Sequence, residues 1–220
     1  MIKVENIHKK YLLGKVEVPV LKGVSFSIQD GEWIALLGSS GCGKTTLLNI
    51  IGTLESTDNG DVFIRDKAIS SFKRKEKELF RNQKVGFIFQ TYHLLPELTV
   101  LENVLLPATF ANAKNAKPKA KELIEQVGLS HRIKHKPMEL SGGERQRAAI
   151  ARALINNPEI ILADEPTGNL DSKTGQEILN IFQKLKNDGF VKTIIMVTHD
   201  EKIAKLADKI IKLKDGVIYE

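Results

Sequence analysis

A glycine-rich segment near the N-terminus contains residue types that bind phosphate. It reads Gly38-Ser39-Ser40-Gly41-Cys42-Gly43-Lys44-Thr45 and matches the pattern G-x-x-x-x-G-K-[ST] in full. Residues 33–37 before it indicate a strand, and residues 46–51 after it indicate a helix. Glycines let backbone N–H groups turn toward phosphate oxygens, and the helix directs its positive N-terminal end at the same anion. Lys44 is therefore predicted to reach the β- and γ-phosphates of a nucleotide, and the Thr45 hydroxyl to bind Mg²⁺.

Two adjacent acids follow a second apolar strand much later in the chain. Residues 160–163 predict the strand, and Asp164 and Glu165 stand at its carboxyl end, where ligands bind in sheets of this kind. Asp164 is predicted to hold Mg²⁺, directly or through water, and Glu165 to act as the general base that polarises the attacking water. A solvated acidic turn is the alternative, and the phosphate loop upstream argues against it.

A third motif, Leu140-Ser141-Gly142-Gly143-Glu144, precedes a helix predicted over residues 145–156. Ser141 and Glu144 have the spacing of a capping box, which is an ordinary structural explanation. Two glycines inside a first helical turn are unfavourable, however. They are explained if another molecule approaches the backbone N–H groups closely. We therefore expect a second anion site at this helix N-terminus.

These motifs together resemble those of the ABC (ATP-binding cassette) ATPases, over essentially the whole chain. The sequence 140–144, followed by Arg145-Gln146-Arg147-Ala148, is similar to the signature motif of that family. The resemblance implies that Tyr11 stacks on adenine and that Gln90 senses Mg²⁺ and the attacking water. It also implies that His199 contacts the γ-phosphate.

The resemblance further implies a homodimer in which two cassettes enclose two ATP molecules. Each ATP would contact the phosphate loop of one subunit and Ser141 and Gly143 of the other, with Asp171 in the loop at the dimer interface. The predicted cofactors are ATP and Mg²⁺, and the predicted metal ligands are Thr45, Gln90 and Asp164. The predicted catalytic residues are Glu165, His199 and Gln90. The predicted ATP-binding residues are Tyr11, Gly38, Ser39, Ser40, Gly41, Cys42, Gly43, Lys44, Thr45, Thr46, Ser141, Gly142, Gly143, Glu144 and Asp171.

Longer stretches of the amino-acid sequence narrow the resemblance to one group within the family. Residues 89–96, 102–104 and 163–172 look most like the group of lipoprotein-releasing ATPases, macrolide and antimicrobial-peptide exporters, and a cell-division ATPase. This implies a peripheral protein on the cytoplasmic face of the cell (inner) membrane. It would power a separate transmembrane permease for export or extraction of a lipoprotein, peptide or drug. The cargo is read by the permease and is not specified by this chain.

Two other classes share parts of this pattern. A soluble ABC ATPase of DNA repair or translation carries long coiled-coil insertions or a second cassette, and 220 residues leave room for neither. A metabolic P-loop kinase would not need the motif at 140–144. The net charge of +6 comes from basic residues interleaved with acidic ones. No aromatic-rich basic stripe is present, so we expect no nucleic-acid partner.

Short β-branched runs alternate with amphipathic stretches and predict an α/β fold with a mainly parallel sheet. With the resemblance, the expected fold is the P-loop ABC-type ATPase fold, with N-terminal antiparallel strands and an inserted helical subdomain. A single domain is expected over residues 1–220, with its α/β core at about 1–91 and 157–220 and the helical subdomain at about 92–156. The single cysteine excludes an intramolecular disulfide. No apolar run approaches the roughly 20 residues that cross a bilayer.

The segment after Gln90 concentrates apolar side chains in a predicted loop and helix start. We expect it to form the docking surface for the permease, because a clustered apolar patch on a loop usually marks an interface. The alternative is that some of these residues belong to the core of the helical subdomain. They are Tyr92, Leu94, Leu95, Leu98, Val100 and Leu101.

Overall fold

The computed structural model describes residues 1–219, and the chain forms two compact units. The first consists of Met1–Glu78 together with the segment from Lys192 onward, and the second of Leu79–Val191. Within the stretch 92–156, all of which is described, the regular structure is helical. The boundaries drawn from the sequence for a helical subdomain stay a prediction.

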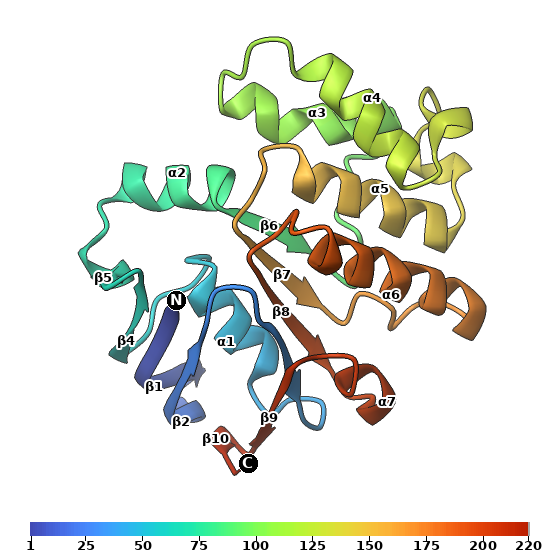
Figure 1. Cartoon of the computed structure of the whole chain (residues 1–220). Helices are drawn as coiled ribbons and strands as arrows, with labels where there is room; N and C mark the ends of the chain where they lie inside the picture. The colour runs from blue at the N-terminus through green and yellow to red at the C-terminus, as the bar shows by residue number, and fades with distance from the viewer. Residues whose placement is uncertain (220) are drawn as a thin grey trace. The chain divides into compact units, whose positions relative to one another are not determined.

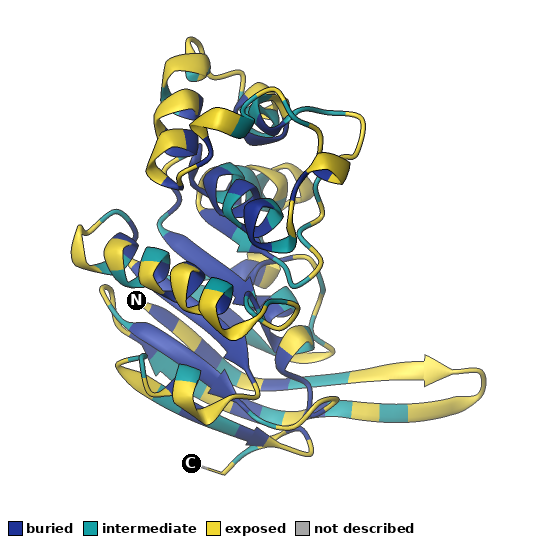
Figure 2. Ribbon diagram, turned by 90° about the vertical axis from the view of Figure 1, so that its right-hand side faces the viewer, coloured by how far each residue is buried: buried dark blue, intermediate teal, exposed yellow. Residues whose placement is uncertain are grey.

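The first unit contains an antiparallel sheet in the strand order β2-β1-β4-β5. Its strands are β1 (Ile2–Leu13), β2 (Val16–Ile28), β4 (Asn59–Ile64) and β5 (Lys67–Ala68). Figure 2 shows the outer part of the β1–β2 hairpin extending with mostly exposed residues. The sequence predicts only residues 24–28 of this pair as strand. The outer half buries neither face and lacks an alternating apolar pattern. The start of β1 does alternate, with Ile2 and Val4 buried, and it was overlooked.

The same unit contains strands in the order β10-β9-β3-β8. Strands β3 (Trp33–Leu37), β8 (Thr193–Thr198) and β9 (Lys209–Lys214) run parallel, and β10 (Val217–Ile218) returns antiparallel to β9. All residues of β3 and β8 are buried, which explains their continuous apolar runs. Helix α1 (Lys44–Ile51) follows β3 and α7 (Glu201–Ala204) follows β8. A 3₁₀ turn, Ile69–Ser71, follows β5.

The second unit contains the parallel strands β6 (Val85–Ile88) and β7 (Ile160–Asp164). Its helices are α3 (Val100–Phe110), α4 (Ala116–Gln126), α5 (Gly142–Leu154) and α6 (Ser172–Asn187). Figure 1 shows α3 and α4 side by side, next to α5. Short 3₁₀ turns lie at Ser130–Arg132 and Pro137–Glu139.

Helix α5 packs closely on β6, and small residues permit this contact. A Cβ on Gly86 would lie 2.8 Å from the carbonyl oxygen of Ala153 and 2.6 Å from Ile161 Cδ1. The middle of the helix, residues 148–151, is fully buried. The C-terminal half of α5 is therefore packed against β6, the strand that precedes Gln90.

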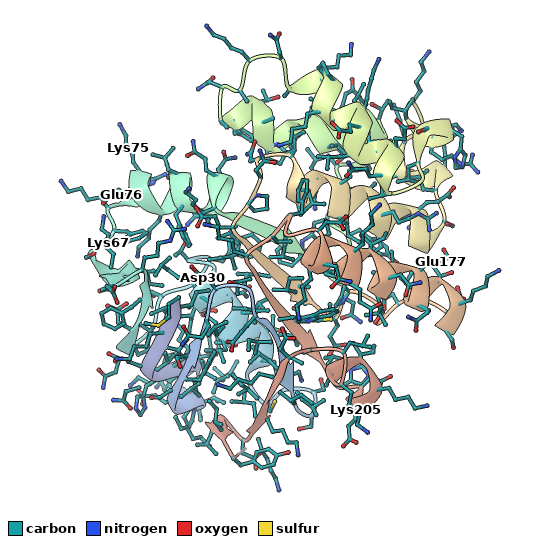
Figure 3. The ribbon with its side chains drawn as sticks, in the orientation of Figure 1. Asp30, Lys67, Lys75, Glu76, Glu177 and Lys205 are labelled. Carbon is teal, nitrogen blue, oxygen red and sulfur yellow. The ribbon has the colours of Figure 1, made fainter. Side chains whose placement is uncertain are left out.

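Helix α2 (Arg74–Gln83) begins in the first unit. Its first turn is tied to β5, where Lys67 Nζ lies 3.0 Å from Glu76 Oε1, and both residues are labelled in Figure 3. Among residues 1–219, no helix is long and apolar enough to cross a membrane.

Candidate nucleotide-binding site

The phosphate loop joins β3 to α1, as the sequence predicts. Gly41 and Gly43 have φ angles of 80° and 103°, which favour glycine. Gly43 is the N-cap of α1 and makes no side-chain cap, whereas Ser141 and Asp171 cap α5 and α6 with their side chains. No capping side chain therefore competes with an anion at the N-terminus of α1, and this arrangement fits a phosphate group.

Gly38 and Lys44 shape the inside of this loop. A Cβ on Gly38 would lie 2.2 Å from the carbonyl oxygen of Leu213 and 2.7 Å from Cys42 Sγ, so only glycine fits. The Lys44 side chain is buried, and its Nζ donates to the carbonyl oxygens of Gly38 and Ser39 at 2.8 Å each. The loop thus holds a positive charge where phosphate oxygens would be bound. Cys42 is also buried.

His199 lies at the same sheet edge as the start of the phosphate loop. Leu37 of β3 pairs with Thr198 of β8 in parallel register. Gly38 and His199 therefore leave the two strands side by side, and His199 is exposed there. This is the position that the resemblance implies for a residue contacting a γ-phosphate, and the contact itself stays a prediction.

Tyr11 on β1 is linked to the helix of the phosphate loop. Its hydroxyl donates to Glu55 Oε2 at 2.7 Å and lies 3.3 Å from Thr46 Oγ1. Burial raises the pKa of Tyr11, and the hydrogen bond to Glu55 raises it further. Lys9 Nζ lies 5.5 Å from the ring centroid and 3.4 Å from Glu55 Oε1. The sequence did not predict the roles of Lys9 and Glu55, because ordinary surface charges so far apart carry no signal.

In the second unit, Gln90 and Glu165 lie close together. Ile88 of β6 pairs with Ala163 of β7 in parallel register. Gln90 and Glu165, each two residues further on, therefore lie at the same edge of these strands. A Cβ on Gly168 would lie 2.7 Å from Gln90 Nε2 and 3.3 Å from Glu165 Oε2, so the two side chains approach one point. The structure thus brings together the residues predicted to orient and to activate a water molecule.

Asn169 holds Gln90 in this position. Gln90 Nε2 donates to Asn169 Oδ1 at 3.3 Å, and Asn169 Nδ2 donates to the carbonyl oxygen of Gln90 at 3.1 Å. Glu165 itself has a φ angle of 43°, in the left-handed region that non-glycine residues rarely adopt. Backbone strain of this kind is concentrated at functional sites, where the surrounding structure enforces it.

The motif at 140–144 forms a complete capping box. The Glu144 amide donates to Ser141 Oγ at 3.2 Å, and the Ser141 amide donates to Glu144 Oε2 at 2.8 Å. Helix α5 begins at Gly142, three residues before the predicted start at Arg145, so both glycines lie in its first turn. A Cβ on Gly143 would lie 2.2 Å from Thr174 Cγ2. Packing therefore explains Gly143 independently of any ligand, and this packing was not predicted from the sequence.

Glu144 and Asp171 have structural partners of their own. The hydrogen bond from the Ser141 amide holds the pKa of Glu144 below its usual range, and Arg132 Nε, 2.9 Å from Glu144 Oε1, adds to this. Asp171 caps α6 by accepting from the amides of Lys173 and Thr174. The hydrogen bond from the Thr174 side chain lowers the pKa of Asp171, and those two amides lower it further. The ATP contacts predicted for both residues stay predictions.

Arg152 on α5 holds the loop after Gln90. Its guanidinium donates to the carbonyl oxygens of Tyr92, at 2.8 Å, and His93. These two loop residues have positive φ angles of 64° and 48°. Burial lowers the pKa of Arg152. Nothing in the amino-acid sequence indicates this contact, because it joins residues about sixty positions apart.

Asn103 fixes the rest of that loop. It is fully buried; its Nδ2 donates to the carbonyl oxygens of Leu95 and Leu98, and its Oδ1 accepts from the Leu95 amide. Leu95 is 43% exposed, whereas Val100 is buried. The inclusion of Val100 in a docking surface was therefore wrong, because this residue begins α3 with its side chain in the core.

Comparisons with known proteins show the family to which the chain belongs. The family model described as ABC transporter matches residues 21–168. The lipoprotein-releasing system ATP-binding protein LolD of Saccharophagus degradans is 47% identical, over 99% of this chain and 96% of its own length. An uncharacterized ABC transporter ATP-binding protein of Methanocaldococcus jannaschii is 47% identical, over 100% of this chain and 98% of its own.

The macrolide export ATP-binding/permease protein MacB of Rhodopirellula baltica is 46% identical, and the chain spans only 33% of its length. Among solved structures, the dimeric post-hydrolysis state of the ATP-binding cassette MJ0796 bound to ADP and Pi has a TM-score of 0.92. It is 42% identical and is matched over 100% of this chain and 97% of that one. The likeness in fold and in sequence extends over the full chain, and the predicted fold class is confirmed. The chain belongs to the ABC transporter family, as one of its ATP-binding cassettes.

Proposed function

We propose that this chain binds and hydrolyses ATP as a homodimer and thereby powers a separate transmembrane permease. The observation that carries the proposal is the phosphate loop, in which the buried Lys44 ammonium lies inside glycine turns at a helix N-terminus without a capping side chain. The solved relative MJ0796 is a dimer bound to ADP and Pi, which supports both hydrolysis and dimerisation.

Each group has a chemical task in this proposal. Lys44 and the backbone N–H groups of the loop bind the phosphates, and Tyr11 stacks on adenine. Glu165 takes a proton from the attacking water while Gln90 orients it, and His199 contacts the γ-phosphate. Ser141 and Gly143 contact the ATP held by the second copy. ATP favours the closed dimer because only that state offers it both sets of donors.

Mg²⁺ fits the residues present. Thr45 with its hydroxyl, Asp164 with its carboxylate and Gln90 with its amide oxygen are hard oxygen donors, the type this ion prefers. Among residues 1–219, no group of three or more His, Cys, Asp or Glu side chains could hold a metal. This agrees with an ion that takes its other ligands from phosphates and water. When bound, it would neutralise charge developing on the phosphates.

The relatives support a role in export or extraction. Their names describe a lipoprotein-releasing system and macrolide export. We place this chain on the cytoplasmic face of the membrane, where ATP is available, and its cargo is a lipoprotein, peptide or drug read by the permease. The docking surface is the loop after Gln90 with the start of α3. Its apolar residues Tyr92, Leu94, Leu95, Leu98 and Leu101 are partly or fully exposed.

Phosphate release by the purified chain tests the proposal. We expect Mg²⁺-dependent ATP hydrolysis, and we expect Lys44→Ala to lower kcat/KM by about a hundredfold or more. Lys75→Ala, which changes an exposed lysine on α2, is the matched control and should have normal activity. Equal hydrolysis by Lys44→Ala and the wild type would contradict the proposal.

A further inference from the structure

Gln146 is a buried polar residue on α5 that packing alone does not explain. Its side chain is completely buried, and its Nε2 donates to the carbonyl oxygen of Pro166 at 2.7 Å. Only the amino group of an amide can donate to a carbonyl, so this bond fixes the amide orientation. The other end, Oε1, is buried and has no hydrogen-bond partner within residues 1–219. An unpaired buried acceptor is destabilising, so an apolar side chain of the same size would suit the core better.

The hydrogen bond reaches the turn that carries Glu165. Pro166 directly follows Glu165, whose φ angle is 43°. The Gly168 amide donates to the Glu165 carbonyl oxygen at 3.0 Å and closes a turn over residues 165–168. The bond from Gln146 attaches the Pro166 carbonyl in the middle of this turn to α5. It therefore opposes relaxation of Glu165 from its strained conformation toward a common one.

The same helix begins with the motif at 140–144. Gln146 lies in the second turn of α5, directly after the capping box of Ser141 and Glu144. A helix moves as a rigid element over this distance, so a displacement at its N-terminus is passed to Gln146. The hydrogen bond to Pro166 then passes it to the backbone of Glu165.

We propose that Gln146 is a positioning residue that couples the signature helix to the general base, so that Glu165 is correctly oriented only while α5 is correctly placed. The inference rests on the proposed function, in which Glu165 is the base. It explains why this buried position has a polar side chain with an unpaired oxygen. It also gives the helix that contacts the second copy's ATP a direct mechanical link to the hydrolytic site of its own chain.

The test replaces Gln146 by a residue of similar shape without a donor. For Gln146→Met we expect kcat for ATP hydrolysis to fall by about tenfold to a hundredfold. ATP affinity should stay within about twofold. The thermal midpoint should change little, because removal of the unpaired oxygen offsets the loss of the donor to the buried Pro166 carbonyl oxygen. Gln176→Met, on the exposed face of α6, is the matched control and should match the wild type. An unchanged kcat, or a parallel loss of ATP affinity, would overturn the inference.

Single-turnover rates separate this inference from the proposed function. If Gln146 acts through Glu165, adding Gln146→Met to Glu165→Gln should not lower the residual rate further. Multiplicative losses would show that Gln146 acts elsewhere. Wild-type hydrolysis by Glu165→Gln would overturn both proposals, whereas a slow Glu165→Gln beside a normal Gln146→Met would overturn only this one. If Gln146→Met fails to fold, Gln146→Leu, which is also apolar and has no donor, gives the same decision from kcat.

Discussion

Arg152 should stabilise the fold and position the loop after Gln90. The change Arg152→Met keeps the apolar length of the side chain and removes two charge-assisted hydrogen bonds, to the carbonyl oxygens of Tyr92 and His93. Such bonds contribute about 1.5–3 kcal/mol each when both partners are buried. His93 is exposed and Tyr92 is half-buried, so water can replace part of this. Removing the guanidinium also relieves its desolvation, which is the cause of its lowered pKa.

The expected net loss is therefore about 2 kcal/mol of unfolding free energy, which for a chain of this length lowers Tm by about 4–8 °C. Because Gln90 precedes this loop, kcat should also fall about tenfold with little change in ATP affinity. Urea unfolding and steady-state hydrolysis measure the two effects. The control is Arg74→Met, which removes an exposed i,i+4 pair with Glu78 and should cost less than about 0.5 kcal/mol. A loss at Arg152 no larger than at Arg74, with normal kcat, would refute the reasoning.

Three further results are expected. Tyr11→Ala should raise the KM for ATP about fivefold to tenfold while kcat changes little, because stacking contributes about 1 kcal/mol; an unchanged KM in hydrolysis assays would remove Tyr11 from the site. Tyr92→Ala with Leu95→Ala should leave hydrolysis by the isolated chain intact and weaken co-purification with the permease; a folded double variant that binds the permease normally would move the docking surface elsewhere. The pKa of Glu144 is lowered in the folded chain. Its carboxylate therefore stabilises the fold at pH values above the ordinary glutamate pKa of about 4.3, and this stabilisation is lost as the pH falls through the lowered pKa. Between pH 6 and pH 3 the unfolding free energy should therefore depend less on pH in Glu144→Gln than in the wild type. The same pH dependence in both proteins would contradict this role.

The strand-to-helix setting of the phosphate loop was predicted from the sequence, because this motif is contiguous and its chemistry is local. The phosphate loop needs only glycines, one lysine and a strand-to-helix turn. All of these lie within the fourteen residues from Trp33 to Thr46. Strand β3 was predicted at its observed bounds, since a buried parallel strand reads as a short apolar run between polar segments.

The residues that hold these motifs in place were not predicted. Gln146, Arg152 and Asn103 act on backbone carbonyl groups, and a carbonyl partner leaves no trace in the amino-acid types around it. The outer part of the β1–β2 hairpin was missed for another reason. Both of its faces meet solvent, so backbone pairing rather than an apolar face defines it.

The most direct test of the central claim is the behaviour of Glu165→Gln with ATP. The amide keeps the shape of the side chain and removes the base, so hydrolysis should be nearly abolished while ATP binding is retained. With turnover blocked, ATP should convert the variant from monomer to dimer in size-exclusion chromatography. A variant that stays monomeric with ATP and still hydrolyses it at the wild-type rate would contradict the account.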